Sequence, residues 1–284
     1  MAVLNPIKSA LTAAGQWRWL QPLLNLPWLR AVLRRVPLLR LLVPDGWDRR
    51  HPYDAQHGTD TSGTVPLDQL AVSTAALEGA HLYGGSQPSI IRTLLRSLPG
   101  LESGAFRFID LGCGKGRPLF VAAEFPFAEV IGVELSPVLA RVAERNAERM
   151  RAANPALAPV TVVEGDATAY PFPSGPFVLF LYNPFGEALI AKVLAQVEAA
   201  LKAEPRTIYV VYYNPVFGHC FDASPLLSRR FARTLPYAAD ELGYGPDQAD
   251  PIVIWQPGDG RPLPGTEARI VITTPEMRSE LVPA

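Results

Sequence analysis

The chain has 284 residues, a net charge of −1 and an apolar content of 48%. This composition is that of a globular protein and excludes a disordered chain, and the length suits one domain of about 200 residues with an extension. The two cysteines, Cys113 and Cys220, are too few for a disulfide framework, so we expect a reducing, cytoplasmic setting.

The first 50 residues differ in charge from the rest of the chain. They hold eight Lys/Arg and two Asp, a net charge of +6, whereas the other 234 residues carry 18 Lys/Arg and 25 Asp/Glu, a net charge of −7. This asymmetry is a reason to consider an anionic partner for the N-terminal part. We predict that residues 1–78 form a basic, Trp-rich extension of helices and loops, which caps the active site or contacts a partner, and that residues 79–284 form the main domain.

Within the extension, residues 17–43 form a basic amphipathic segment. A single helical face would carry the apolar side chains of Trp28, Leu29, Val32, Leu33 and Val36. Two interpretations stay open: this face docks on the main domain, or it makes peripheral contact with an anionic membrane. Three prolines interrupt the segment and weaken the membrane interpretation. No stretch has the roughly 18 uninterrupted apolar residues of a membrane span, and residues 1–16 lack the pattern of a signal peptide.

Two segments lead into the main domain. The first, residues 57–63 (HGTDTSG), is crowded with hydrogen-bonding groups, and it is either a surface loop or a flap over a bound ligand. The second begins with a loop that contains Tyr83 and continues as a helix, with Pro88 near its first position and an apolar stripe that ends at Leu98.

The stretch from Phe106 to Glu134 has the order strand, glycine turn, helix, strand, acid. An apolar run ends at Asp110, and the next three alternate positions are Gly112, Gly114 and Gly116. Glycines allow a sharp turn and close approach of the backbone to a ligand. The second apolar run ends in Glu134, where a carboxylate can accept hydrogen bonds from both hydroxyls of a ribose. The stretch therefore predicts half of a nucleotide-binding α/β sheet.

The glycine spacing distinguishes between nucleotides. A dinucleotide fingerprint, G-x-G-x-x-G, would need glycine where this chain has Arg117, which argues against an NAD-dependent oxidoreductase. The observed D-x-G-x-G-x-G pattern, which starts at Asp110, resembles the first motif of class I S-adenosylmethionine-dependent methyltransferases. The resemblance implies a doubly wound, Rossmann-like α/β fold with a seven-stranded, mostly parallel sheet, and S-adenosylmethionine as cofactor.

The same resemblance assigns roles to the residues of the motif. It implies that Gly112, Gly114 and Gly116 pass under the methionine and ribose parts of the cofactor. It also implies that Asp110 lies near the cofactor amino group and that Glu134 holds the ribose. We expect the neighbouring Cys113 and Leu135 to contact the cofactor as well.

The later elements continue the alternation of strand and helix. Ser136 and Pro137 have the types expected at a helix start. Further strands are expected over 160–163, 177–182 and 207–213, and a helix over 189–201. Apolar runs around 231–235, 252–256 and 269–274 are predicted to supply the antiparallel end of the seven-stranded sheet. The order of these last strands cannot be derived from the pattern.

Three positions beyond the first motif are candidate site residues by resemblance. Asp166 follows the third strand, where an acid in these methyltransferases accepts from the adenine amino group, and Ala167 beside it joins the cofactor site; the alternative for Asp166 is a turn residue. Asn183 begins Asn-Pro-Phe-Gly after the fourth strand, which resembles the [D/N/S]-P-P-[Y/F/W] motif of amino-methyltransferases with one proline missing. It is a candidate for both cofactor contact and recognition of a target amine; the alternative is a rigid turn.

The loop before the first motif carries a second partial resemblance. Tyr83 and Gly84 resemble the Tyr-Gly-Glu loop of Dot1-like protein lysine methyltransferases, with Gly85 in place of the glutamate. We expect Tyr83 to close over the cofactor methionine; an ordinary turn tyrosine is the alternative. No metal site is expected, because His219 and Cys220 lack other ligand-spaced partners.

Together these features predict a methyltransferase that moves a sulfonium methyl group to a nitrogen or oxygen nucleophile of a small-molecule or protein acceptor. Asn183 and Tyr83 are the candidate catalytic residues, and Tyr83, His57 or Asp60 could accept a proton if the N-terminal loops close over the site. The alternative is a non-catalytic S-adenosylmethionine-binding module that docks a partner or membrane through residues 17–43. The net charge of −7 on the catalytic part argues against a nucleic-acid partner.

Overall fold

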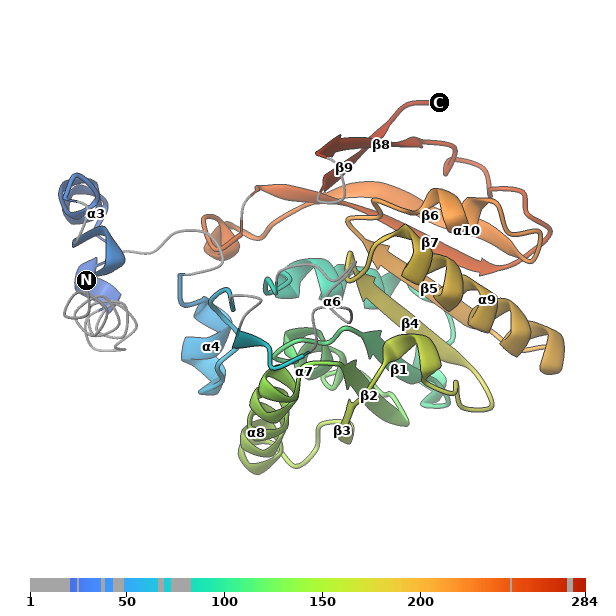
Figure 1. The fold of residues 1–284 in the computed structure, drawn as a ribbon, viewed down its shortest axis with the longest axis horizontal. Coiled ribbons are helices and arrows are strands. Elements are labelled where there is room, and N and C mark those ends of the chain that lie inside the picture. The colour runs from blue at the N-terminus through green and yellow to red at the C-terminus, as the bar shows by residue number, and fades with distance from the viewer. Residues whose placement is uncertain are drawn as a thin grey trace.

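The computed structural model describes residues 21–24, 26–36, 39–42, 49–65, 69–72, 83–245, 247–274 and 278–284. Seven strands form its central sheet: β1 Arg107–Leu111, β2 Glu129–Glu134, β3 Val160–Glu164, β4 Phe177–Tyr182, β5 Ile208–Tyr213, β6 Leu227–Pro236 and β7 Ala249–Pro257. Their order is β3-β2-β1-β4-β5-β7-β6 (Figure 1). The first five strands are parallel, and β7 is antiparallel to both β5 and β6. The predicted doubly wound, mostly parallel sheet is confirmed.

Helices cover both faces of this sheet because side chains alternate along each strand. The helices α6 Pro88–Ser97 and α7 Arg117–Ala122 pack against the face that includes Phe108 and Val178. Helix α9 Glu187–Ala203 and the short α10 His219–Asp222 pack against the opposite face, which includes Ile109 and Leu179. The two buried clusters account for the continuous apolar runs in the strands.

Local sequence signals set several element boundaries. Helix α8 Pro137–Ala153 begins as predicted, with Pro137 in its first turn and the Ser136 hydroxyl accepting the Leu139 N–H at 3.3 Å. Strand β4 has the predicted bounds and is buried over five of its six residues. Short 3-10 turns connect other elements: η4 Leu101–Ser103, η5 Ala167–Ala169 and η6 Ala239–Glu241.

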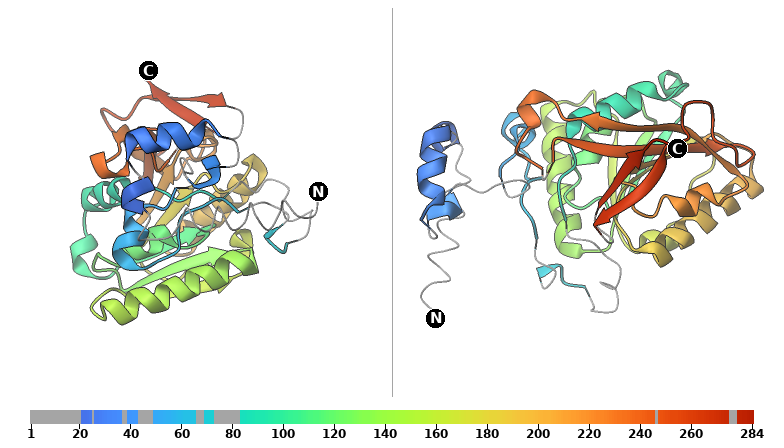
Figure 2. Two further views of the ribbon diagram at one scale, coloured as in Figure 1. Left: turned by 90° about the vertical axis from the view of Figure 1, so that its left-hand side faces the viewer. Right: turned by 90° about the horizontal axis from the view of Figure 1, so that it is seen from above.

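The C-terminal strands depart from the prediction. Residues 269–274 do form a strand, β8 Arg269–Thr274, but it pairs with β9 Arg278–Val282 in a separate two-stranded sheet. The expectation that this run belongs to the seven-stranded sheet was wrong. Ile270 and Leu281 pack against the core on the α9 face, so the hairpin crosses over β6 and β7 instead of extending them (Figures 1 and 2). Only this packing, which the apolar run does not encode, distinguishes the two arrangements.

The N-terminal helices lie at one end of the molecule, apart from the sheet in Figure 1 and in the right view of Figure 2. They are α2 Gln21–Leu24, α3 Pro27–Arg34 and the 3-10 turn η1 Leu39–Leu42. Pro27 occupies the first turn of α3, where a missing N–H costs nothing, so it starts this helix. Of the predicted segment 17–43, residues 17–20, 25, 37, 38 and 43 lie outside the described residues.

A further helix within residues 1–78, α4 Pro52–His57, packs on the main body, because its Tyr53 belongs to the same buried cluster as α6 and α7. No helix in the described parts of the chain is long and apolar enough to span a bilayer.

Candidate active site

A cleft of about 360 Å³ opens at the carboxyl edge of the sheet. It lies where the chain leaves β1 and β4, the two strands between which the strand order reverses. Ligands of open α/β sheets bind at this switch point. Every cofactor-site residue predicted from the sequence except Gly116 lines the cleft: Asp110, Gly112, Cys113, Gly114, Glu134, Leu135, Asp166, Ala167 and Asn183.

The glycine turn after β1 needs glycine for its conformation and for its neighbours. Gly112, Gly114 and Gly116 have φ of 81°, 56° and 90°, in the left-handed region that other residues rarely adopt. A Cβ on Gly114 would lie 2.3 Å from ring carbons of Tyr83. Gly116 lies behind the cleft, where a Cβ would meet Phe120 at 2.8 Å. The turn is therefore packed between Tyr83 and the start of α7.

Glu134 at the end of β2 is held by backbone amides. Its Oε2 accepts the Gly114 N–H at 2.8 Å and its Oε1 accepts the Ser136 N–H at 2.9 Å. Burial raises the pKa of Glu134, and these backbone hydrogen bonds oppose the increase. Each carboxylate oxygen has a second lone pair, so the side chain retains capacity for two ligand hydroxyls. This arrangement suits the ribose role that the resemblance implies.

Asp110, in β1, faces the cleft with an unsatisfied atom. The side chain is 2% exposed, and its Oδ2 has no hydrogen-bond partner among the described residues. Burial, with the nearby Glu134 carboxylate as a second cause, raises the pKa of Asp110 well above its ordinary value. A buried carboxyl oxygen without a donor is costly. A ligand with a cationic amino group would remove that cost and stabilise the charged carboxylate.

The far end of the cleft is formed by the segment after β3 and by Leu135. Asp166 Oδ1 accepts the backbone N–H and the hydroxyl of Thr168, each at 2.8 Å, and so caps the 3-10 turn η5. The side chain also lines the cleft, so the turn role and the adenine role are compatible. Leu135 is 38% exposed at the cleft, and Ala167 is buried beside it. These apolar surfaces suit the face of a planar base.

Two asparagines end neighbouring strands in the same unusual conformation. Asn183 follows β4 with φ 38°, and Asn214 follows β5 with φ 52°; both are buried, line the cleft and precede a proline. The Tyr212 hydroxyl donates to Asn183 Oδ1 at 3.2 Å, and the Ser279 N–H donates to Asn214 Oδ1 at 2.9 Å. Left-handed backbone at non-glycine residues persists only where its surroundings hold it, and such residues cluster at functional sites.

The N-terminal segment 49–65 packs onto the back of the glycine turn through a buried ion pair. Asp54 and Arg117 are 1% and 2% exposed and approach to 3.9 Å. Arg117 Nε donates to the Thr61 hydroxyl at 2.7 Å, and its Nη2 donates to the Thr61 carbonyl at 2.8 Å. Arg117 thus anchors the loop that was predicted to be either a surface loop or a flap.

Asp54 collects the polar groups of that loop. Its carboxylate accepts hydrogen bonds from the hydroxyls of Thr59 at 2.7 Å, Thr61 at 2.6 Å and Ser62 at 2.6 Å, and from the Thr61 N–H at 3.0 Å. Burial alone would raise the pKa of Asp54, but Arg117 and these hydroxyls outweigh burial and lower it. This pair was not predicted, because no local pattern links Arg117, the residue after the glycine motif, to Asp54 on another element.

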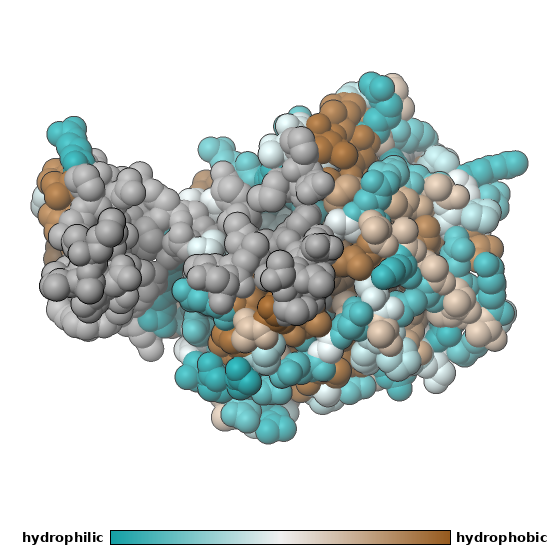
Figure 3. Space-filling model, viewed as in Figure 1, coloured by the Kyte–Doolittle hydropathy of each residue, from teal (hydrophilic) through white to brown (hydrophobic). Residues whose placement is uncertain are grey.

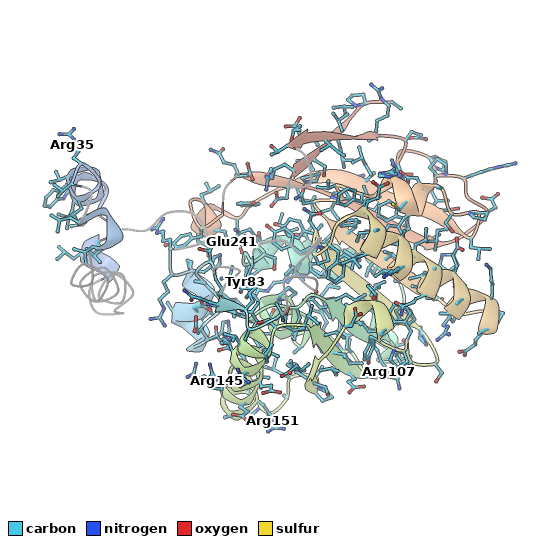
Figure 4. The ribbon with its side chains drawn as sticks, viewed as in Figure 1. Arg35, Tyr83, Arg107, Arg145, Arg151 and Glu241 are labelled. Atoms are coloured by element: carbon cyan, nitrogen blue, oxygen red, sulfur yellow. The ribbon has the colours of Figure 1, made fainter. Side chains whose placement is uncertain are left out.

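Tyr83 lies between this loop and the glycine turn, near the centre of the molecule in Figure 4. Its hydroxyl donates to the Thr61 carbonyl at 2.7 Å, and burial raises its pKa far above the usual value. The phenol is therefore held protonated, which does not favour it as a base. Its ring contacts Gly114 and lines the cleft, which agrees with a role in positioning the cofactor.

The other two candidate bases do not reach the cleft. His57, in the last turn of α4, stacks on Tyr53 with ring centroids 4.3 Å apart. Asp60 pairs with Lys115 at 3.3 Å, and its side chain is 61% exposed. Neither residue is among those that line the cleft. The condition for a base role, that the N-terminal loops bring these side chains over the site, is not met in the structure, where their neighbours Thr61 and Ser62 contact Arg117 instead.

Cationic side chains at the cleft were also missed. Lys192, on the second turn of α9, is exposed at the rim, and Arg278, the first residue of β9, reaches the cleft from the C-terminal hairpin. Arg278 pairs with Asp247 and, at 3.2 Å, with the buried Asp250. No local motif marks either residue, since both reach the site only through tertiary packing.

The fold and the site define a nucleotide-binding domain of the doubly wound class, with a glycine turn, a ribose-type acid and an unsatisfied carboxyl at the switch point. Comparison with known proteins makes this more specific. Residues 108–204 match the family model described as a methyltransferase domain. The match agrees with the S-adenosylmethionine-dependent methyltransferase class that the glycine turn predicts, and the unpaired Asp110 Oδ2 together with Glu134 fits that cofactor.

Individual proteins resemble this chain in part. The demethylmenaquinone methyltransferase of Thermus thermophilus is 30% identical over 143 residues, which span 48% of this chain and 60% of that protein. The O-methyltransferase of Bacillus cereus in complex with SAH is 16% identical, covers 67% of this chain and 84% of its own, and has a TM-score of 0.42. An RNA methyltransferase of Salinibacter ruber with S-adenosyl-L-homocysteine is 18% identical over 61% of this chain and 94% of its own, with a TM-score of 0.39. Such distant structural likeness does not identify an acceptor.

Proposed function

We propose that this protein transfers the methyl group of S-adenosylmethionine to a nitrogen or oxygen nucleophile of a small-molecule acceptor. The observation that carries the proposal is the cleft itself. The cleft contains a buried, unpaired carboxyl oxygen on Asp110 and the Glu134 carboxylate, which accepts backbone hydrogen bonds. Both lie beside a turn whose conformation favours glycine. These groups match the amino, ribose and backbone contacts that the cofactor requires.

The chain's part in the reaction is binding, orientation and exclusion of water. When bound, S-adenosylmethionine supplies an electrophilic methyl group on a positively charged sulfur. Asp110 and Glu134 would hold the amino group and the ribose of the cofactor, and the Tyr83 ring covers the glycine turn. Asn183, whose Oδ1 accepts a hydrogen bond from the Tyr212 hydroxyl, would orient the acceptor's nucleophile. Fixing two reactants in line can supply roughly 7–11 kcal/mol of the barrier reduction.

The part of the cleft next to Asn183, which we take as the acceptor end, favours a molecule with an apolar or aromatic body. Pro184, Phe185 and Leu189 line it together with Tyr182, whose ring lies 4.3 Å from that of Tyr213. The curated relative is named for demethylmenaquinone. Quinones and phenols with apolar side chains therefore belong in the acceptor screen beside amines.

Two measurements test the proposal. Calorimetry should detect binding of S-adenosylmethionine and of its demethylated product at micromolar concentrations, and a screen with isotope-labelled cofactor should detect transfer to an acceptor. Cofactor binding without transfer to any acceptor would support a non-catalytic binding module. Absence of binding up to millimolar cofactor would refute the cofactor site. With an acceptor in hand, an Asn183→Ala variant with unchanged turnover would exclude Asn183 from the chemistry.

We also propose that α2 and α3 place the enzyme on an anionic membrane surface. Trp28, Val32 and Val36 recur every four residues and are 64%, 52% and 44% exposed, and Leu23 is 50% exposed. Figure 3 shows a small brown area at the left edge of the molecule, and Figure 4 shows Arg35 projecting outward from α3. Residues 1–50 carry a net charge of +6. Exposed tryptophan with surrounding basic residues suits an anionic interface.

Vesicle cosedimentation tests this placement. The full chain should bind vesicles with 30 mol% phosphatidylserine and bind neutral vesicles more weakly, and Trp28→Glu should reduce binding to the anionic vesicles at least tenfold. A Val271→Glu variant is the matched control, because Val271 is 40% exposed on the C-terminal hairpin. Equal binding by the Trp28→Glu variant and the wild type would refute contact through this face.

A further inference from the structure

The starts of α9 and α10 bring three different metal-ligand side chains together. Glu187 is the first residue of α9, and His219 and Cys220 are the first two residues of α10. His219 Nε2 lies 2.9 Å from Glu187 Oε1 and 3.7 Å from Cys220 Sγ, and the three ligand atoms all lie within 4.8 Å of one another. Sequence spacing offered no third ligand, because Glu187 precedes His219 by 32 residues.

We propose that Glu187, His219 and Cys220 form a binding site for a divalent transition metal, with zinc as the best chemical match. A carboxylate oxygen, an imidazole nitrogen and a thiolate are the ligands that zinc takes in proteins. With bond lengths of about 2.0–2.3 Å, tetrahedral geometry places nitrogen and sulfur ligands about 3.5 Å apart and nitrogen and oxygen ligands about 3.3 Å apart. The nitrogen–sulfur distance in the structure already agrees, and Glu187 needs to move outward by about half an ångström.

The element that carries two of the ligands is held firmly. Gly218, which precedes α10, is packed so closely that a Cβ would lie 2.5 Å from Ile270. Phe221 in α10 is fully buried, and Asp222 accepts the Trp255 indole N–H at 3.0 Å and pairs with Arg229. The ligands therefore project from a fixed turn, which reduces the entropy lost when a metal orders them.

Charge and proton balance are simple at this site. Binding breaks the S–H bond of Cys220, the proton leaves to solvent, and the thiolate forms the metal–sulfur bond. In the structure His219 Nε2–H donates to Glu187 Oε1. When the metal binds, the neutral imidazole changes tautomer, so that its one proton resides on Nδ1, the Nε2 lone pair binds the metal, and Glu187 binds as a carboxylate. Two negative ligands and Zn²⁺ give a neutral site with no redox change, and water completes the fourth position.

The metal would connect two elements that support the acceptor side of the cleft. Glu187 follows the Asn183–Gly186 turn, and α10 follows the Asn214 turn, and both turns begin at asparagines that line the cleft. A bound metal would hold α9 to α10 and fix the spacing of these two turns. This inference is independent of the methyl-transfer proposal, because metal binding is measured without cofactor or acceptor.

The experiment uses the full chain without an affinity tag, reduced and freed of metal. Competition with a chromophoric chelator should show one equivalent of zinc, and cobalt substitution should give a thiolate-to-cobalt absorption band and a tetrahedral visible spectrum. Cys220→Ser, His219→Gln and Glu187→Gln should each weaken zinc binding about a hundredfold or more, since even residues that only support metal ligands are worth about 10–100-fold.

Two matched controls should keep the wild-type affinity: His57→Gln, a histidine on α4, and Glu204→Gln, an exposed carboxylate just after α9. Circular dichroism of each variant shows whether it is folded. If any of the three ligand variants binds zinc as tightly as the controls do, the proposed Glu187–His219–Cys220 site is wrong. A wild-type cobalt complex without the thiolate band would also overturn it.

Discussion

The Asp54–Arg117 pair gives the sharpest prediction about how this molecule is held together. In Asp54→Asn, one carboxylate oxygen becomes an NH₂ group that faces the fixed Thr61 N–H or a neighbouring hydroxyl, and Arg117 loses its counter-charge while it is 2% exposed. Leaving one member of a buried pair uncompensated costs about 3–5 kcal/mol. Arg117 keeps its bonds to the Thr61 and Ser86 carbonyls, so we expect the lower end, about 3 kcal/mol.

Urea unfolding followed by circular dichroism measures this loss. Asp60→Asn is the matched control, since Asp60 lies in the same loop, its side chain is 61% exposed, and its partner Lys115 keeps a hydrogen bond to the Ser62 carbonyl; it should cost less than about 1 kcal/mol. The double variant Asp54→Asn/Arg117→Met should be more stable than the sum of the single losses predicts, by roughly 1–3 kcal/mol. Additive losses, or a loss for Asp54→Asn equal to that of the control, would refute the account of a coupled buried pair.

The same pair predicts a pH dependence. The pKa of Asp54 is lowered in the folded protein, so the stability it contributes is fully present above its unfolded pKa of about 3.9. That contribution is lost as the pH falls through the lower folded value. The stability difference between wild type and Asp54→Asn should therefore shrink below about pH 4. A difference that stays constant down to pH 2 would contradict the assigned cause.

Three further predictions concern the site and its supports. Asp110→Asn should weaken binding of S-adenosylmethionine at least tenfold by calorimetry, because it removes the acceptor for a cationic amino group. It should not lower the melting temperature, because it also removes a buried titratable carboxyl. Gly114→Ala should abolish cofactor binding, because its φ is 56° and the new methyl would overlap Tyr83, whereas Gly165→Ala, with nothing within 4 Å of its Cβ, should bind normally. Burial, the main cause, lowers the pKa of His51 to about 3, so the free energy of unfolding of the wild type should fall as the pH drops from 7 toward 3. In urea titrations, His51→Gln should make this fall with pH smaller. An equal fall in the variant and the wild type would contradict the prediction.

The sequence by itself determined the parallel strands of the central sheet and the floor of the cleft. Strand β4, the start of α8 and the turn from Asp110 to Gly116 follow from patterns within a few residues of each other. Glu134 was identifiable because the parallel strand that carries it must end at the same edge of the sheet as β1. Local backbone preference and strand periodicity suffice for these features.

Only the tertiary structure decided which distant groups meet. Arg117 could be read as a break in a dinucleotide motif, but not as the partner of Asp54, which lies on another element. The strand over 269–274 was predictable, and its exclusion from the main sheet was not. Glu187 and His219 likewise meet because α9 and α10 pack side by side. Buried polar groups need partners, but the chain positions that supply them are fixed by packing of whole elements, which no local pattern records.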